Sequence, residues 1–133
     1  MAATIPEQFK DLFGKVAFAH LATLMPDGSP HVTPVWVDYD DGAYVRVNSA
    51  KERVKDKNMR RNKRVALSIQ DPENPYRYLG IRGEVVEITE NGADAHIDAL
   101  AKKYLGKERY PFRNPAEVRV IYKIRPDKVS TSG

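Results

Sequence analysis

The sequence predicts a mainly β protein in which antiparallel strands form a small barrel with a few peripheral helices. Six segments alternate between apolar and polar residues with the two-residue period of a strand. The first three follow one another through turn-sized connections, which leaves no place for the crossover helices of a parallel sheet. Gly80 and Gly83 lie inside the longest segment, as is typical of barrel corners. We therefore expect a six-stranded antiparallel split β-barrel.

The N-terminal residues predict a short amphipathic helix followed by three strands. Thr4 and Glu7 have the spacing of a capping box, apolar residues follow at helical spacing, and Gly14 is a typical helix end. Turn residues around Gly28 and Gly42 then separate the strands. These strands are expected at residues 16–24, 31–39 and 43–48.

A second helix should follow directly, because Ser49 and Glu52 form another capping box. We expect this helix to begin near Ala50 and to run to about Asn62, on the surface, since it has few apolar residues. A third helix should begin after Asn91 as its cap and end at Gly106. The remaining strands are expected at residues 65–69, 76–88 and 118–124, before a polar tail.

Length and composition indicate one globular domain over residues 1–133, with 41% apolar and 30% charged residues. The chain has no cysteine, which excludes disulfides, thiolate metal sites and a cysteine nucleophile. Its longest uncharged run, residues 16–26, is much shorter than the roughly 20 residues of a membrane helix. Residues 1–15 lack the pattern of a signal peptide. We expect a cytoplasmic protein that does not bind membranes.

The histidines and paired carboxylates do not form a recognisable catalytic or metal site. His20, His31 and His96 lack the close spacing of metal ligands, and no glycine-rich phosphate loop is present. We expect His20 in the core and His31 exposed. Asp40 and Asp41 fit a turn better than acid–base catalysis.

Basic charge is concentrated in one short segment, residues 51–64, which carries eight basic and two acidic side chains. This segment has a net charge of +6 and the whole chain +4, so the other residues sum to −2. Lys51, Arg53 and Lys55 fall at the expected start of a helix, where backbone N–H groups and the helix dipole favour an anion. The pattern predicts a phosphate site, with a solvated basic helix as the alternative. A nucleic-acid-binding barrel is disfavoured because residues 51–64 contain no aromatic residue.

Two motifs together resemble the split-barrel flavin and deazaflavin proteins related to pyridoxamine 5′-phosphate oxidase. Residues 20–24 (HLATL) and 27–36 (DGSPHVTPVW) are similar to the first hairpin of that family. Residues 45–49 (VRVNS), with the RVK and NMRR sequences at 53–55 and 58–61, are similar to its phosphate-binding strand and helix.

The resemblance implies a homodimer with two cofactor sites at the subunit interface. Arg53 and Lys55 match the residues that hold the cofactor phosphate, and the segment from Thr33 to Trp36 matches the strand that lines the tricyclic ring. The expected cofactor-binding residues are Thr33, Pro34, Val35, Trp36, Asn48, Ser49, Lys51, Arg53, Lys55 and Asn58.

The short branch that uses coenzyme F420 is the closer match, because the arginine-bearing substrate strand of the oxidases has no counterpart that we locate. The anionic tail of F420 could be bound by further cations of the basic segment, namely Lys51, Lys57, Arg60 and Arg61. FMN is the alternative cofactor.

The resemblance implies hydride transfer between the deazaflavin and an electron-poor conjugated small molecule. No catalytic side chain can be named. The proton would come from solvent or from Tyr76, Tyr78 or Tyr110. Two alternatives stay open: an FMN-dependent oxidase or reductase of the pyridoxamine phosphate oxidase type, and a carrier that binds F420 without catalysis.

Overall fold

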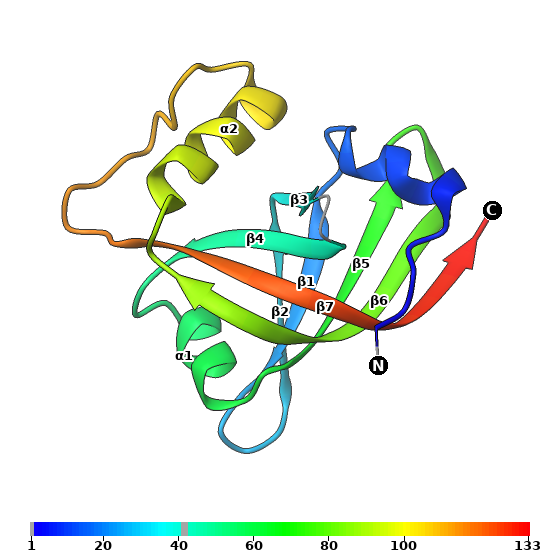
Figure 1. Cartoon of the computed structure of the whole chain (residues 1–133), viewed down its shortest axis with the longest axis horizontal. Coiled ribbons are helices and arrows are strands. Elements are labelled where there is room, and N and C mark those ends of the chain that lie inside the picture. Colours follow the sequence, from blue (N-terminus) through cyan, green and yellow to red (C-terminus); the bar gives the residue numbers. More distant parts are fainter. Residues whose placement is uncertain (1, 41–42) are drawn as a thin grey trace.

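In the computed structural model, which describes residues 2–40 and 43–133, one antiparallel sheet curls into a split barrel (Figure 1). The described chain contains seven strands: β1 (Ala19–Leu24), β2 (Pro30–Val35), β3 (Val37–Asp40), β4 (Tyr44–Ala50), β5 (Arg64–Asp71), β6 (Asn74–Thr89) and β7 (Arg119–Ser132). Its helices are the 3-10 helix η1 (Glu7–Phe13) and the α-helices α1 (Val54–Arg61) and α2 (Ala93–Leu105). The predicted fold class is therefore confirmed, but the predicted number of strands is wrong.

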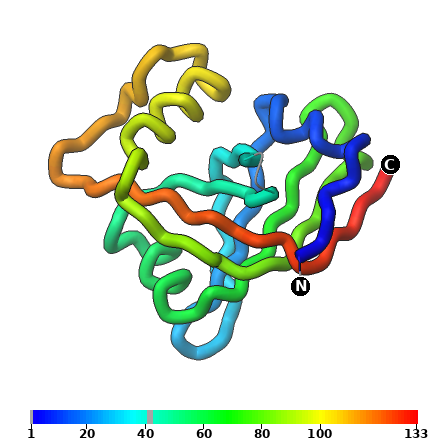
Figure 2. The backbone as a smooth tube through the Cα atoms, viewed as in Figure 1, coloured from blue at the N-terminus to red at the C-terminus, as the bar shows by residue number. Residues whose placement is uncertain are grey.

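The seventh strand arises because the segment expected at residues 31–39 breaks at Trp36. Figure 2 shows the curled path of the backbone through the sheet. Before the break, Val35 lies opposite Ala19 of β1; after it, Val37 lies opposite Val47 of β4. The strand order is β2-β1-β5-β6-β7-β4-β3, so β2 and β3 are the two edges of the sheet. Since one residue joins these edges, the sheet must curl until they meet.

Alternating side chains of the strands fill the barrel as the sequence predicted. In β7, Val120, Tyr122 and Ile124 are fully buried, and in β4 Val45 and Val47 face them. Helix η1 closes one end of the barrel with three apolar side chains, those of residues 9, 12 and 13. The burial of these alternating positions supplies the hydrophobic free energy that holds the curled sheet together.

Strand β6 is irregular at Gly83, one of the two glycines at which a bend is expected. A Cβ atom at Gly83 would lie only 2.2 Å from the carbonyl oxygen of Arg125, so only glycine allows this approach to β7. The register between the two strands shifts at Arg82/Gly83. The expected polar tail is wrong, because β7 continues to Ser132, which lies opposite Tyr78 of β6. Backbone hydrogen bonds extend this pairing although the outward side chains are polar.

The predicted caps of η1 and α2 are not formed. Helix η1 follows Pro6, which makes no side-chain cap, so the expected Thr4 capping box is wrong. Helix α2 is preceded by Gly92 in the left-handed conformation (φ 77°) instead of by a capping Asn91. The predicted end of α2 is confirmed, since Gly106 is also left-handed (φ 68°) and its N–H reaches carbonyls of the last turn.

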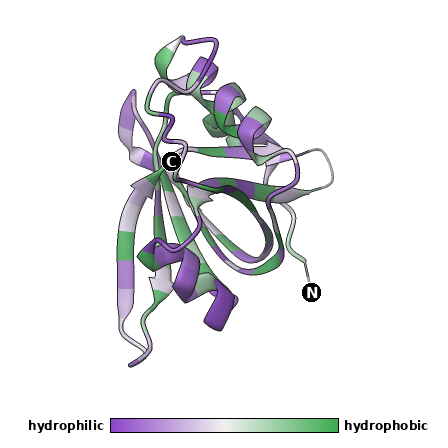
Figure 3. Ribbon diagram, turned by 90° about the vertical axis from the view of Figure 1, so that its left-hand side faces the viewer, coloured by the Kyte–Doolittle hydropathy of each residue, from purple (hydrophilic) through white to green (hydrophobic). Residues whose placement is uncertain are grey.

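Helix α2 packs against β4 and β7 outside the barrel and covers the place where the sheet edges meet (Figure 1). In Figure 3 its residues alternate between hydrophobic and hydrophilic colours, whereas α1 is mostly hydrophilic. The Tyr104 hydroxyl accepts the N–H of Val37 at 3.1 Å and donates to the carbonyl of Ala17 at 2.7 Å. Lys103 donates to the carbonyls of Val37 and Phe13 at 2.5 and 2.7 Å. Side chains of α2 thus satisfy the backbone at the strand break.

Two of the histidine expectations are wrong. His20 is exposed, because the inward positions of β1 are Ala19, Leu21 and Thr23. His31 is half-buried instead of exposed. The expected turn at Asp41 lies outside the described residues. None of the helices described is long and apolar enough to cross a bilayer.

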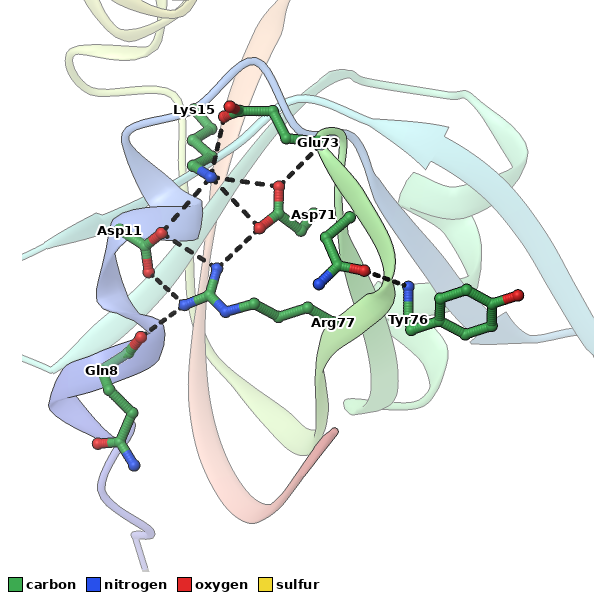
Figure 4. Close-up of polar contacts among 8 residues, drawn as sticks. Gln8, Asp11, Lys15, Asp71, Glu73, Tyr76 and Arg77 are labelled. Atoms are coloured by element: carbon green, nitrogen blue, oxygen red, sulfur yellow. Dashed lines mark hydrogen bonds and ion pairs between the residues drawn. The ribbon is translucent and has the colours of Figure 1, made fainter. Parts of the chain in front are cut away.

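An ion-pair network fastens η1 to the turn between β5 and β6 (Figure 4). Asp71 accepts the N–H of Glu73 at 2.9 Å and pairs with Arg77 at 2.9 Å and with Lys15 at 3.2 Å. Arg77 also binds Asp11 of η1 at 2.7 Å. These contacts, led by the N–H of Glu73, lower the pKa of Asp71 to about 2.

Asp71 should stabilise the fold except in strong acid. Its pKa is lower in the folded than in the unfolded chain, where it is near 3.8, so its contribution is complete above pH 4 and is lost as the pH falls through 2. We expect Asp71→Asn to lower the melting temperature at pH 7, with a difference from the parent that shrinks between pH 4 and pH 2. Thermal melts followed by circular dichroism test this. A difference that is constant from pH 7 to pH 2 contradicts it, and Glu73→Gln is the exposed control.

Candidate functional site

An open pocket lies where the sheet edges meet, bordered by β2, β4, the start of α1, helix α2 and the segment that follows α2. Its interior volume is about 170 Å³. Both charged and aromatic side chains line it. The lining residues are Phe18, Pro34, Val35, Trp36, Asn48, Arg53, Lys55, Ile97, Tyr110, Phe112 and Arg119.

Three cations converge on this pocket. Lys55 is half-buried and has no carboxylate partner within residues 2–40 and 43–133. Burial, and then the charges of Arg53 and Arg119, lower the pKa of Lys55. Arg119 is only 8% exposed, and burial lowers its pKa as well. Like charges that are held together away from water favour binding of an anion.

The predicted start of α1 is wrong, and the reason lies in β4. Ser49 remains in that strand opposite Val120, with its buried hydroxyl unpaired, so it cannot cap a helix. The chain then turns, with the N–H of Arg53 bonded to the carbonyl of Ala50 at 3.3 Å. Glu52 occupies the third position of this turn in the left-handed conformation (φ 79°), which is costly for a residue other than glycine. The turn places Arg53 at the helix start.

Asp56 anchors the first turn of α1 to the barrel. Its buried carboxylate accepts the N–H of Glu52 at 3.0 Å, the Tyr122 hydroxyl at 2.5 Å and the guanidinium of Arg60 at 3.0 Å. Burial alone would raise the pKa of Asp56, but these hydrogen bonds, the one from Tyr122 foremost, keep it below its usual value. Tyr122 belongs to the core of β7, so this contact fixes the helix start, and with it Arg53, to the sheet.

Aromatic rings form one wall of the pocket. Trp36 stacks on Tyr104 with ring centroids 5.2 Å apart, and Tyr110 meets Trp36 edge-on at 6.0 Å. Phe112 packs edge-on against Tyr110 at 5.6 Å, and the guanidinium of Arg119 lies 5.1 Å from the Tyr110 ring. The pocket therefore combines a planar apolar surface with cations, the combination that an aromatic, anionic ligand requires.

The family model described as pyridoxamine 5′-phosphate oxidase matches residues 5–133. The chain belongs to this family. A solved F420 reductase is 36% identical, and the alignment covers 95% of this chain and 98% of that protein with a TM-score of 0.82. This pyridoxamine 5′-phosphate oxidase family member therefore shares its fold, over almost its whole length, with the F420 reductase.

Other solved structures resemble the chain in fold. A conserved hypothetical protein from Mycobacterium tuberculosis is 22% identical over 98% of this chain and 86% of its own, with a TM-score of 0.77. A protein of unknown function from Agrobacterium tumefaciens is 17% identical over 100% of this chain and 60% of its own, with a TM-score of 0.73. No curated protein matches the sequence closely.

The structure brings six of the ten predicted cofactor-binding residues to one pocket of this family member. These six are Pro34, Val35, Trp36, Asn48, Arg53 and Lys55. Four others lie elsewhere. They are Thr33, whose buried hydroxyl is unpaired; Ser49, buried in β4; Lys51, paired with Glu90 at 3.0 Å; and Asn58, whose amide donates to Thr23 at 3.0 Å. A direct cofactor contact stays a prediction for each of the ten.

The additional cations of the basic segment also bind groups of the protein itself. Lys57 lies 3.8 Å from Glu52, and Arg60 pairs with Asp56 at 3.0 Å. Arg61 donates to the carbonyl of Leu24 at 3.0 Å. They line no part of the pocket, so the expectation that they hold an anionic tail gains no support from its geometry.

Sequence reasoning missed several lining residues, above all Arg119. Its signal was an isolated arginine between Val118 and Val120 in a predicted strand. The outer face of β7 becomes part of a pocket only because α2 covers it, and no local pattern predicts that contact. The described residues contain no group of three or more His, Cys, Asp or Glu side chains that could hold a metal ion.

Asp56 should contribute strongly to stability through the start of α1. Asp56→Asn places an NH₂ group where one carboxylate oxygen accepts a hydrogen, so we expect a loss of about 1–3 kcal/mol in the free energy of unfolding. Urea denaturation measures this. The matched control is Asp94→Asn in the first turn of α2, which is 74% exposed and should change stability by less than about 0.5 kcal/mol. Equal losses in both variants contradict the anchoring role.

Proposed function

We propose that this protein binds coenzyme F420 in the pocket and acts as a reductase on an electron-poor conjugated small molecule. The observation that carries the proposal is the convergence of Arg53, Lys55 and Arg119 beside the aromatic wall. Lys55 lacks a carboxylate partner among the described residues, and Arg119 Nη1 makes no hydrogen bond there, so the site fits an anionic group. The 36% identity to an F420 reductase supports F420 as that ligand.

Residues of the chain would bind and orient the cofactor. Arg53 and Lys55 would hold its phosphate, while Pro34, Val35 and Trp36 would contact its ring system. The bound cofactor supplies the hydride-transfer chemistry. Of Tyr76, Tyr78 and Tyr110, the candidates for proton delivery, only Tyr110 lines the pocket among the described residues. Tyr76 is 83% exposed on β6.

A second copy of the chain would complete the site. The pocket of one chain, about 170 Å³, is smaller than the roughly 300–1,000 Å³ of typical cofactor pockets. Phe18 and Phe112 at its rim are 45% and 66% exposed. A partner subunit that covers these rings would deepen the pocket and bury their apolar surface.

FMN is the second candidate cofactor. A phosphate bound by Arg53 and Lys55 could belong to either molecule, and the cations Lys57, Arg60 and Arg61 are engaged by the protein itself. A carrier that binds F420 without catalysis would use the same contacts, so turnover must be tested separately from binding.

Binding titrations test the cofactor and its phosphate contacts. We expect F420 to bind more tightly than FMN, and Arg53→Ala or Lys55→Ala to weaken F420 binding about 10- to 100-fold through loss of a charge-assisted hydrogen bond. Fluorescence polarisation with F420, and quenching of FMN fluorescence, give the dissociation constants. The control Lys57→Ala removes a cation of the same helix outside the pocket and should change affinity less than twofold.

Three results contradict parts of this proposal. Equal or tighter binding of FMN assigns the protein to flavin, and no binding of either cofactor rejects the site. Unchanged affinity in Arg53→Ala and Lys55→Ala places the phosphate elsewhere. Consumption of reduced F420 in the presence of conjugated enones or quinones separates a reductase from a carrier.

Dimerisation is expected from the small size of the one-chain pocket. Sedimentation at micromolar concentration should give a species of about 30 kDa, twice the 15.1 kDa of one chain. Phe112→Asp should shift this species toward the monomer, because it places a charge in the expected interface. A 15.1 kDa parent protein contradicts the shared site.

A further inference from the structure

Arg119 is the least explained side chain of the pocket. It is 8% exposed and lines the pocket beside Arg53 and Lys55, but the group of the ligand that it would contact is not yet defined. Its Nε donates to Asn48 Oδ1 at 2.9 Å, and its buried Nη1 makes no hydrogen bond with any described residue. A buried guanidinium with an unmet donor is costly unless a ligand supplies the acceptor.

A chain of hydrogen bonds fixes the orientation of Arg119. Asn48 Nδ2 lies 2.9 Å from the carbonyl of Ala93 and 3.1 Å from His96 Nδ1, and His96 Nε2 lies 3.0 Å from Asp38. Arginine can only donate, so the oxygen of the Asn48 amide must face Arg119 and its NH₂ must face His96. The proton of His96 then lies on Nε2 and is donated to Asp38.

A carboxylate of the protein already lies between the two guanidinium groups. Glu117 Oε2 accepts from Arg53 at 2.7 Å, and its Oε1 lies 3.7 Å from Arg119 Nη1. The hydrogen bond from Arg53 lowers the pKa of Glu117, so it is ionised near neutral pH. One oxyanion can therefore contact both arginines, although the distance to Arg119 is too long for a hydrogen bond.

We infer that Arg119 binds the same oxyanion of the ligand as Arg53, and that this oxyanion takes the place of Glu117. Asn48, His96 and Asp38 are positioning residues for Arg119. The inference rests on the proposed function in taking the cofactor phosphate as the oxyanion. It adds a third binding cation and an internal competitor that weakens ligand binding.

Substitutions at the two ends of this contact should act in opposite directions. Relative to the parent, Arg119→Gln should weaken F420 binding about 10- to 100-fold, and Arg119→Lys should give an intermediate affinity because charge remains without the bond to Asn48. Glu117→Gln should tighten binding about three- to tenfold, since no carboxylate must be displaced. The matched control Arg125→Gln removes an arginine of the same strand that pairs with Asp127 at 2.7 Å outside the pocket. It should change affinity less than twofold.

The test of the positioning residues must give a result that a general loss of stability would not give. Asn48→Ala should weaken F420 binding in the parent but have no further effect in the Arg119→Gln background, because the amide acts through Arg119. An equal effect in both backgrounds overturns the positioning role. Melting temperatures of the ligand-free variants identify any that do not fold, and Glu117→Gln then decides alone: tighter binding supports the inference, and unchanged or weaker binding overturns it.

Failure of this inference can be distinguished from failure of the proposed function. If Arg53→Ala weakens F420 binding and Arg119→Gln does not, the proposed function stands and the inference is wrong. If the parent binds neither F420 nor FMN, pyrophosphate is the probe. A rise in melting temperature that Arg119→Gln abolishes supports the anion site, and a rise that it leaves unchanged, or no rise, overturns it.

Discussion

The passage of the chain through Trp36 determines both the barrel and its pocket. One residue connects the two edges of the sheet, so the edges must meet, but backbone groups at this break cannot all find a neighbouring strand. Helix α2 supplies the missing partners through Tyr104 and Lys103, which bind the N–H and carbonyl of Val37. Burial lowers the pKa of Lys103 to about 8, a cost that these hydrogen bonds offset. The pocket lies at this junction because helix, strand ends and the following segment meet there.

Several unfavourable features lie in the pocket or beside it. In the pocket, Lys55 is half-buried and Arg119 is buried, each beside another cation. Next to it, Glu52 is held in a left-handed conformation and the hydroxyl of Ser49 is buried without a partner. Such exceptions persist where surrounding structure enforces them, and Asp56 is the enforcing contact through its bonds to Tyr122 and the backbone. A barrel stabilised by many alternating apolar side chains tolerates this local loss.

Features that depend on local periodicity could be predicted from the sequence, and features that depend on long-range contacts could not. Alternation predicted the inward positions of β4, β5 and β7 but misplaced His20 of β1, and Gly83 marks the register shift in β6. Ser49 had the spacing of a cap, but pairing with β7 kept it in a strand. The break at Trp36 has no local signal, since apolar residues continue through it. Arg119 was missed for the same reason, because the cover over its face comes from α2.

Helix α2 therefore connects the integrity of the barrel to the chemistry of the pocket. Its last turn binds the strand break through Tyr104, while its first turn holds the amide of Asn48 through Ala93 and His96. A shift of the helix against β4 would disturb both contacts, because the helix moves as one rigid element. A shift that breaks the hydrogen bond between Tyr104 and Val37 would therefore also release Asn48, the residue that orients Arg119. In this architecture, packing of one peripheral helix determines both how the guanidinium of Arg119 faces the pocket and how the backbone at the strand break is satisfied.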